Sequence, residues 1–263
     1  MRHKILLIIS LSTLSALLSA QAVLSDTNKT DQMGRKQGIW IKNYPDGNIQ
    51  YKGVFTDDHP VGEFIRYNED NTISSVLIYS SDGREADATF YHPNGFIAAK
   101  GKYINQMKEG RWLFYSSFYE GYLISEDLYV NNMRNGPSLQ FFPDTTVAER
   151  IMYVNGKKDG EWIQYYADGK LFLRSGYSDD KLNGKFEVWY ENGQPEISGN
   201  YKDNLRDGPW FIYNQDGTLR YKIDYTLGVT NDRQMDIDAS DLMDRLEKTR
   251  GRIPDPEKTG EIQ

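Results

Sequence analysis

Few side chains in this sequence combine the residue type and the spacing that catalysis or metal binding requires. Outside residues 1–22 the histidines are His59 and His92, each beside a proline in an expected turn, 33 positions apart. We therefore expect these histidines to be ordinary turn residues and not a metal-binding pair. The acidic pairs Asp57-Asp58 and Asp179-Asp180 could bind calcium weakly. Their surroundings lack the oxygen-ligand spacing of a calcium loop, so we expect solvated turns.

Other kinds of active site find equally little support. The chain has no cysteine, which excludes thiol catalysis, disulfides and thiolate metal sites. No serine lies in a nucleophile-elbow context, and the glycines lie in expected hairpin turns instead of between a strand and a helix, where phosphate loops occur. Carboxylates occur in every expected turn, and no pair is singled out. We predict a protein that is not an enzyme and that needs no cofactor or metal.

Aromatic side chains are the one group with a pattern that could serve binding. The chain has 35 Phe, Trp and Tyr residues. Large rings on a sheet can be core, or can remain exposed as a platform for a partner's side chains or a sugar ring. The core role is favoured, because an unlayered sheet has nothing else to pack. The candidate partner-binding aromatics are Trp40, Tyr44, Trp112, Trp162, Tyr166, Tyr190 and Trp210.

The aromatics follow an internal repeat. Repeats start at 38, 62, 86, 110, 136, 160, 184 and 208, a spacing of 24 with one step of 26. Each start is glycine except Ala86, and two positions on the residue is aromatic except at Ala88 and Ser138. Tyrosine or phenylalanine recurs seventeen positions after the start, two residues late at Tyr129 in the longer fourth repeat. Such a register over eight repeats indicates a repeat architecture.

Each repeat reads as a β-hairpin. In the sixth, Glu161–Tyr166 and Lys170–Tyr177 alternate in the manner of strands, joined by Asp168-Gly169, a dipeptide favoured in two-residue type I′ turns. The second turn, Ser178–Asn183, is expected to be longer and polar. No helix-period segment separates the strands, so an antiparallel meander follows. We predict an all-β repeat protein of about eight 24-residue hairpins in an elongated, twisted meander with a short C-terminal capping helix.

Two further expectations concern packing between repeats. Gly53, Gly101 and Gly199, fifteen positions into their repeats, leave room for an aromatic ring from the adjacent strand. The repeats with Ala88 and Ser138 in place of the ring should be the least densely packed, and the freest to bend or to accept a partner.

The ends of the chain differ from the repeats. Residues 1–22 have a basic start, an apolar run of about 14 residues and a small-x-small site, which predicts a signal peptide; a short uncleaved anchor is the alternative. Residues 23–35 are expected to form a flexible leader, 36–231 the repeat domain, 232–250 a helix and 251–263 a disordered tail. We therefore predict an exported protein, periplasmic or secreted, without a transmembrane segment after cleavage.

The chain is acidic, which bears on its partners. Its formal charge is −7, and residues 1–22 contain Arg2 and Lys4 but no acid, so the remainder carries −9. An acidic chain without a basic run argues against nucleic acid and anionic membrane surfaces.

The recurring Gly-x-Trp-x-x-Tyr-Tyr-x-Asp-Gly-Lys, followed by a tyrosine and a polar turn, resembles MORN repeats over residues 36 to about 230. It is most similar to the bacterial variant often described as an antitoxin. The resemblance implies a row of hairpins forming a groove-shaped sheet without an enzymatic site, and roles in protein scaffolding, membrane association or toxin neutralisation.

Three functional hypotheses follow. The first is a non-enzymatic exported scaffold whose groove holds a protein or peptide. The second is an immunity or antitoxin protein, whose acidic surface could complement a basic toxin. The third is a cell-wall carbohydrate-binding protein, because tandem Gly-Trp and Tyr-Tyr-x-Asp-Gly units also occur in wall-binding repeats.

Overall fold

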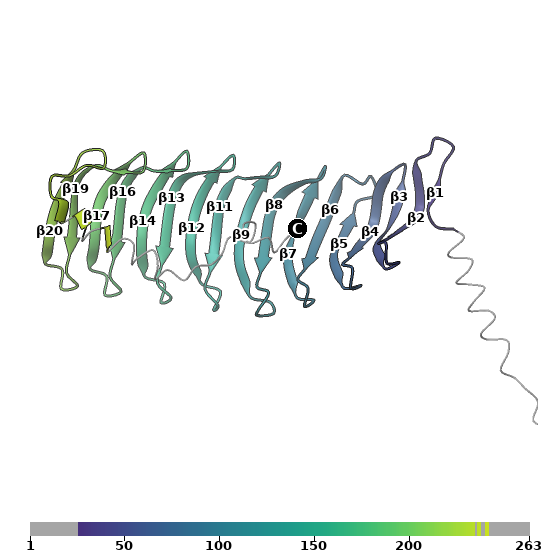
Figure 1. The fold of residues 1–263 in the computed structure, drawn as a ribbon, viewed down its shortest axis with the longest axis horizontal. Helices are drawn as coiled ribbons and strands as arrows, with labels where there is room; N and C mark the ends of the chain where they lie inside the picture. The colour runs from purple at the N-terminus through teal and green to yellow at the C-terminus, as the bar shows by residue number, and fades with distance from the viewer. Residues whose placement is uncertain (1–25, 235, 238–239, 242–263) are drawn as a thin grey trace, which may run out of the picture. The chain divides into compact units, whose positions relative to one another are not determined.

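The fold is all-β and antiparallel. A computed structural model describes residues 26–234, 236–237 and 240–241. The chain divides into two compact units, Met1–Gly95 and Phe96–Gln263. All named elements among the described residues are strands, and within each unit they lie side by side in chain order (Figure 1). The predicted antiparallel meander is confirmed.

The first unit contains six strands. A two-residue strand precedes the repeats, and the longer strands then pair with their sequence neighbours. The strands are β1 (Lys29–Thr30), β2 (Lys36–Asn43), β3 (Ile49–Thr56), β4 (His59–Tyr67), β5 (Ile73–Tyr79) and β6 (Glu85–Tyr91).

The second unit has the same pattern, with strands of six to nine residues and two-residue strands beside some of the turns. The strands are β7 (Ile97–Ile104), β8 (Met107–Tyr115), β9 (Leu123–Val130), β10 (Met133–Arg134), β11 (Gly136–Phe141), β12 (Val147–Val154), β13 (Lys157–Tyr165), β14 (Leu171–Ser178), β15 (Lys181–Leu182), β16 (Gly184–Trp189), β17 (Pro195–Lys202), β18 (Leu205–Arg206), β19 (Gly208–Tyr213) and β20 (Leu219–Tyr225).

The turn within each hairpin is not the predicted type I′. In the sixth repeat Tyr166 N donates to Lys170 O over 2.8 Å, and Gly169 N donates to Tyr166 O over 2.9 Å. Gly169 has a φ of 82°, whereas Asp168 is not among the residues with positive φ. This is a three-residue loop closed by a glycine in the left-handed region, with a bulge in the register at Gln164/Tyr165. Asp168 has another use: its carboxylate accepts from Lys170 N over 3.0 Å.

The turn between hairpins is the tight one. Asp179 and Asp180 have φ of 53° and 67°, the left-handed pair of a type I′ turn, and Ser178 pairs directly with Lys181. The expectation of a longer second turn was wrong, because the strands continue almost to its tip. The residues after the tip then bulge, and the first glycine of the next repeat takes a positive φ there, 88° at Gly184. The repeat's first glycine is therefore explained by the positive φ that the bulge requires.

The exception at Ala86 follows from this geometry. Between β5 and β6 the left-handed residue is Gly83, with φ 70°, and Gly83 N donates to Ser80 O over 3.0 Å. Tyr79 pairs directly with Ala86 and the register runs on without a bulge. A residue with ordinary φ therefore fits at the start of this repeat.

The predicted meeting of glycine and ring is confirmed. A Cβ built on Gly53 would lie 2.2 Å from the Phe64 ring, and one on Gly199 would lie 2.2 Å from the Trp210 ring. Gly101 meets Trp112 at the same distance. Each ring belongs to the repeat that follows the glycine, so the side-chain-free surface of one hairpin is filled by the next.

The two repeats that lack the ring differ in how this position is packed. Ala88 pairs with Leu77, so the large and small partners are exchanged, and Ala88 is 4% exposed compared with 6% for Trp162. Ala88 is therefore as buried as the ring, contrary to expectation. Ser138 is half-buried. Close to it in the chain, Arg134 Nε donates to the buried Asp127 over 3.0 Å.

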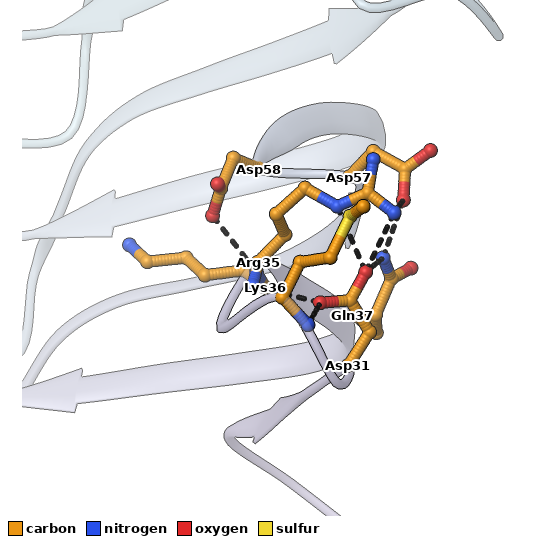
Figure 2. A network of polar contacts seen from close by, with 7 residues as sticks. Asp31, Arg35, Lys36, Gln37, Asp57 and Asp58 are labelled. Carbon is orange, nitrogen blue, oxygen red and sulfur yellow. Dashed lines mark hydrogen bonds and ion pairs between the residues drawn. The ribbon is translucent and has the colours of Figure 1, made fainter.

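The described part of the predicted flexible leader belongs to the sheet, which corrects the expectation for residues 26–35. β1 pairs with β2, and Asn28 imitates a further strand residue: its amide donates to Ile41 O over 3.0 Å and accepts from Ile41 N over 2.8 Å. Figure 2 shows the polar network behind β1, where Arg35 joins Asp31 (2.7 Å) and Asp57 (3.0 Å). The first edge is thus covered.

Other predictions about the ends cannot be compared with the structure. The signal peptide (1–22) and the tail (251–263) lie outside the described residues. The predicted helix over 232–250 falls mostly outside them, and no helix is among the named elements of the described part.

Candidate functional site

The predicted tryptophans of the second unit belong to the core of the sheet face. Trp112, Trp162 and Trp210 are 0%, 6% and 2% exposed. Trp112 packs edge-on against Tyr129, and Trp210 against Tyr225, each with ring centroids 6.2 Å apart. In the first unit Trp40 is half-buried, and its indole NH donates to Lys29 O over 3.1 Å. Packing uses most of the surface of these rings.

The predicted tyrosines connect successive hairpins. Tyr44, Tyr166 and Tyr190 are half-buried, and each hydroxyl donates to a carbonyl 23 residues later: Tyr67 O (2.8 Å), Trp189 O (2.7 Å) and Tyr213 O (2.8 Å). Burial raises the pKa of Tyr166 to about 12, with a further contribution from the nearby Glu196 carboxylate. These hydroxyls form a row of hydrogen bonds beside the three-residue loops.

A second row of hydrogen bonds connects the type I′ turns, and it was not predicted from the sequence. Asp180 N donates to Lys158 O over 2.9 Å while its carboxylate accepts from Lys158 N over 2.8 Å. Asn204 makes the same pair of bonds with Leu182, at 2.9 and 2.6 Å. Asp58 likewise accepts from Lys36 N over 2.8 Å, as Figure 2 shows. Of the acidic pairs considered for calcium, Asp58 and Asp180 therefore make these backbone bonds, and Asp57 and Asp179 form ion pairs with Arg35 and Lys157.

A row of cations lies over the aromatic face, and it too was missed. The residue two before the repeat's glycine is basic in several repeats and stacks on that repeat's own rings. Lys158 Nζ lies 4.9 Å from the centre of the Tyr177 ring, and Arg206 Cζ lies 5.4 Å from that of Tyr225. We call these sites the cation–aromatic notches; their cations are Lys36, Lys108, Arg134, Lys158 and Arg206. The recurring basic position was the available signal.

The last notch holds a carboxylate. Tyr225 OH donates to Asp236 Oδ1 over 2.7 Å, and Arg206 Nη1 donates to the same oxygen over 3.2 Å. Arg206 Nη1 also donates to Ser240 Oγ over 3.4 Å. Burial, followed by the bond to Asp236, raises the pKa of Tyr225 to about 12. A segment beyond the repeats is therefore seated on the aromatic face of the last hairpin.

The fourth repeat's extra two residues form an exposed aromatic loop. Phe118 and Tyr119 are 83% and 72% exposed. Their backbone N–H groups donate to the hydroxyl of the buried Ser116, over 3.0 and 3.2 Å. Tyr122 OH anchors the other end of the loop on Phe141 O, 2.9 Å away. The loop thus presents two large rings to solvent on an ordered backbone.

The histidines give no evidence of a metal centre. His92 is 3% exposed in the loop of the third repeat, where its carbonyl accepts from Gly95 N over 2.8 Å, while His59 is exposed beside a type I′ turn. Among residues 26–241 that the structure describes, no three His, Cys, Asp or Glu side chains are grouped to hold a metal ion.

Comparison with known protein families identifies the kind of repeat. Four segments match the MORN repeat variant: residues 36–57, 158–179, 182–203 and 206–226. These matches support a MORN-repeat protein. No curated protein matches the chain. Within the described residues, no helix has the length and apolar character needed to cross a membrane.

Proposed function

We propose that this chain is a non-enzymatic, exported interaction protein that binds another protein. MORN repeats are generally protein- or membrane-binding modules, which supports an interaction role. The observation that carries the proposal is the Phe118–Tyr119 loop. The backbone that carries these two exposed rings is already held by hydrogen bonds to Ser116, so binding need not order it, and large aromatic side chains are common anchors of protein interfaces.

The surroundings of the loop define the partner's chemistry. Glu120 is exposed in the same loop, and the next loop along the unit carries the exposed Asp144. Neighbouring hydrogen bonds from Thr146 lower the pKa of Asp144, so this carboxylate is charged at neutral pH. A partner that complements this surface has an apolar pocket with lysine or arginine at its rim.

The double substitution of Phe118 and Tyr119 by serine tests this function. Both rings are exposed, so the free energy of unfolding should change by less than about 0.5 kcal/mol for each. We expect a protein that co-purifies with the wild-type chain from its native source to be lost from the variant. A control is Val154→Ser, an exposed residue (47%) at the end of β12, which should retain the partner. Equal recovery with both variants contradicts the proposed contact.

An immunity role is a narrower form of this proposal. The acidic net charge of −7 is its motivation, since it could complement a basic toxin. Inhibition of the product of a toxin-like neighbouring gene would support it. Carbohydrate binding at the predicted tryptophans receives less support, because sugar stacking needs an exposed ring face and Trp112, Trp162 and Trp210 are buried.

A further inference from the structure

One cross-strand row of side chains on the aromatic face changes from apolar to polar within the second unit. Its members are paired directly from strand to strand, which places them on one face of the sheet. The row begins with Phe114 in β8 and becomes apolar again at Leu173 in β14. Between them it is polar over four neighbouring strands. We call these four residues the polar row; they are Ser125, Gln140, Glu149 and Gln164.

Two side chains of the polar row are buried with a polar atom that has no hydrogen-bond partner among the described residues. Ser125 is 4% exposed and Gln164 is 7% exposed, and the atoms concerned are Ser125 Oγ and Gln164 Oε1. The other end of the Gln164 amide is engaged, because its Nε2 donates to a carboxylate oxygen of Glu149. Most buried polar atoms in folded proteins have a partner, so these two atoms indicate a ligand that supplies one.

The polar row has more acceptors than donors, and its carboxylate has no cation beside it. Among the described residues Glu149 takes part in no ion pair, and its carboxylate accepts from Gln164. The cations of the fifth and sixth repeats are engaged elsewhere on the same face. Arg134 donates to Asp127 over 3.0 Å, and Lys158 lies 4.9 Å from the centre of a tyrosine ring. A group that completes the polar row must therefore bring N–H donors and positive charge.

The polar row begins beside the exposed Phe118–Tyr119 loop. Ser125 lies in β9, the strand that follows this loop. Tyr122 OH ties the loop to β11, where it donates to Phe141 O over 2.9 Å. Glu149 lies two strands from Ser125, about 10 Å along the sheet. A partner that contacts the two exposed rings can therefore extend a long side chain onto the polar row.

We propose that the polar row binds an arginine side chain of the protein partner. A guanidinium has five N–H donors in one plane and keeps its positive charge at all physiological pH values. Glu149 supplies the opposite charge, and Gln164 Oε1 accepts a further N–H. The acceptors lie on strands about 4.8 Å apart, a spacing that the broad guanidinium suits better than the compact ammonium of lysine. The proposed function supplies the source of this arginine; the chemistry of the row does not depend on it.

An NMR titration tests the chemistry without a partner. The probe is Nα-acetyl-L-argininamide, added to the full chain labelled with nitrogen-15. The side-chain amide signals of Gln164 should shift to saturation. Nα-acetyl-L-citrullinamide has nearly the same shape without the charge, and it should bind at least about tenfold more weakly. The lysine derivative should also bind more weakly than the arginine derivative.

Two variants locate the binding. Glu149→Gln should weaken binding of the arginine derivative by about tenfold. Glu161→Gln is the matched control, because Glu161 adjoins Trp162 in β13 and points to the opposite face. It should leave the affinity unchanged. Equal binding of the arginine and citrulline derivatives, no saturable shift, or equal effects of the two variants would overturn the proposal. Equal binding of the lysine derivative would overturn the choice of arginine.

A third variant separates binding from a purely structural role. Gln164→Leu continues the row in the way that Leu173 does, and it removes an unpartnered buried oxygen. The midpoint of urea unfolding should therefore not fall, while the affinity for the arginine derivative should. A lower midpoint with unchanged affinity would show that Gln164 serves packing alone and would overturn the proposal. If this variant does not fold, Glu149→Gln decides, since Glu149 is half-buried and tolerates an amide of the same size.

Recovery of the partner distinguishes this proposal from the proposed function. Glu149→Gln should reduce the amount of protein that co-purifies with the chain. Full recovery with this variant would overturn the arginine contact and leave the Phe118–Tyr119 contact standing. Absence of any partner of the wild-type chain would count against the proposed function, whereas the titration with the arginine derivative would still decide the chemistry of the polar row.

Discussion

At the scale of single residues, contacts between successive repeats depend on a few unusual choices. Gly199 has no side chain because the Trp210 ring occupies that position, and a methyl group there would come within 2.2 Å of the indole. The indole is rigid and cannot relieve this clash by a small side-chain rotation, so the strand itself would have to shift.

Gly199→Ala should therefore lower the free energy of unfolding by about 1–3 kcal/mol, measured by urea denaturation. Gly176→Ala is the matched control in a strand of the same unit. Its nearest atoms would be the carbonyl oxygens of Asn183 and Gly160, at 3.3 and 3.4 Å. The loss of glycine's flexibility in the unfolded chain offsets part of that contact. An effect at Gly199 no larger than at Gly176 would contradict ring packing as the cause.

The buried hydroxyl of Tyr166 should make the free energy of unfolding decrease with rising pH in the alkaline range. Its pKa is raised to about 12 in the fold, against an ordinary value of 10.0. Between these values the unfolded chain loses the phenolic proton while the folded chain keeps it. This contribution is complete below pH 10 and is lost as pH rises toward 12. Tyr166→Phe should show a shallower decline of unfolding free energy over that window; an identical slope would contradict the assignment.

At the scale of elements, the type I′ turns join one hairpin to the next. Asp180 holds Lys158 by two bonds, of 2.9 and 2.8 Å, and only one of them uses its side chain. The neighbouring Asn204 shows that an amide performs the same task.

Asp180→Ala should cost about 1–2 kcal/mol, because it removes that bond and places an alanine at a φ of 67°. Asp180→Asn should cost much less, since its amide oxygen still accepts from Lys158 N. Thermal unfolding of the two variants measures the difference. Equal losses of stability would mean that Asp180 stabilises the fold through its charge and not through the hydrogen bond that it accepts from Lys158 N.

The covered first edge offers a local test. Asn28 satisfies both backbone groups of Ile41. Asn28→Ala should leave them to water, and amide exchange at Ile41 should accelerate by about tenfold, equivalent to roughly 1.4 kcal/mol. Exchange at Ile212, in the second unit, is the internal control. Exchange that rises equally at Ile41 and Ile212 would indicate general loosening and not a local cap.

The hairpins could be predicted from the sequence because aromatic residues and glycines that recur every 24 positions determine which strands pair. The same recurrence predicted the ring contacts at Gly53, Gly101 and Gly199. The turn types were not. An Asp-Gly dipeptide suits both a type I′ turn and a three-residue loop, and only the pairing of Tyr166 with Lys170 distinguishes them. The notches were missed because an isolated lysine reads as a solvated surface residue.

At the scale of the whole molecule, residues 1–22 bear on the compartment in which the protein acts. Export remains a prediction from residues 1–22. Protein recovered from its native cells should begin near Val23, as shown by N-terminal mass spectrometry, and should be found outside the cytoplasm. Recovery from the cytosol with Met1 retained would exclude export.

Each glycine and the ring that contacts it belong to different repeats. The 24-residue repeat seen in the sequence is therefore not the segment that can be removed or added without breaking these contacts. A 24-residue copy cut at its first glycine would carry Trp210 without Gly199, or Ala88 without its large partner Leu77. A designer who shortens or lengthens the array should therefore cut within the three-residue loops, so that each inserted piece keeps the second strand of one repeat with the first strand of the next. By the same reasoning, duplication of such a piece is the change that this architecture tolerates best.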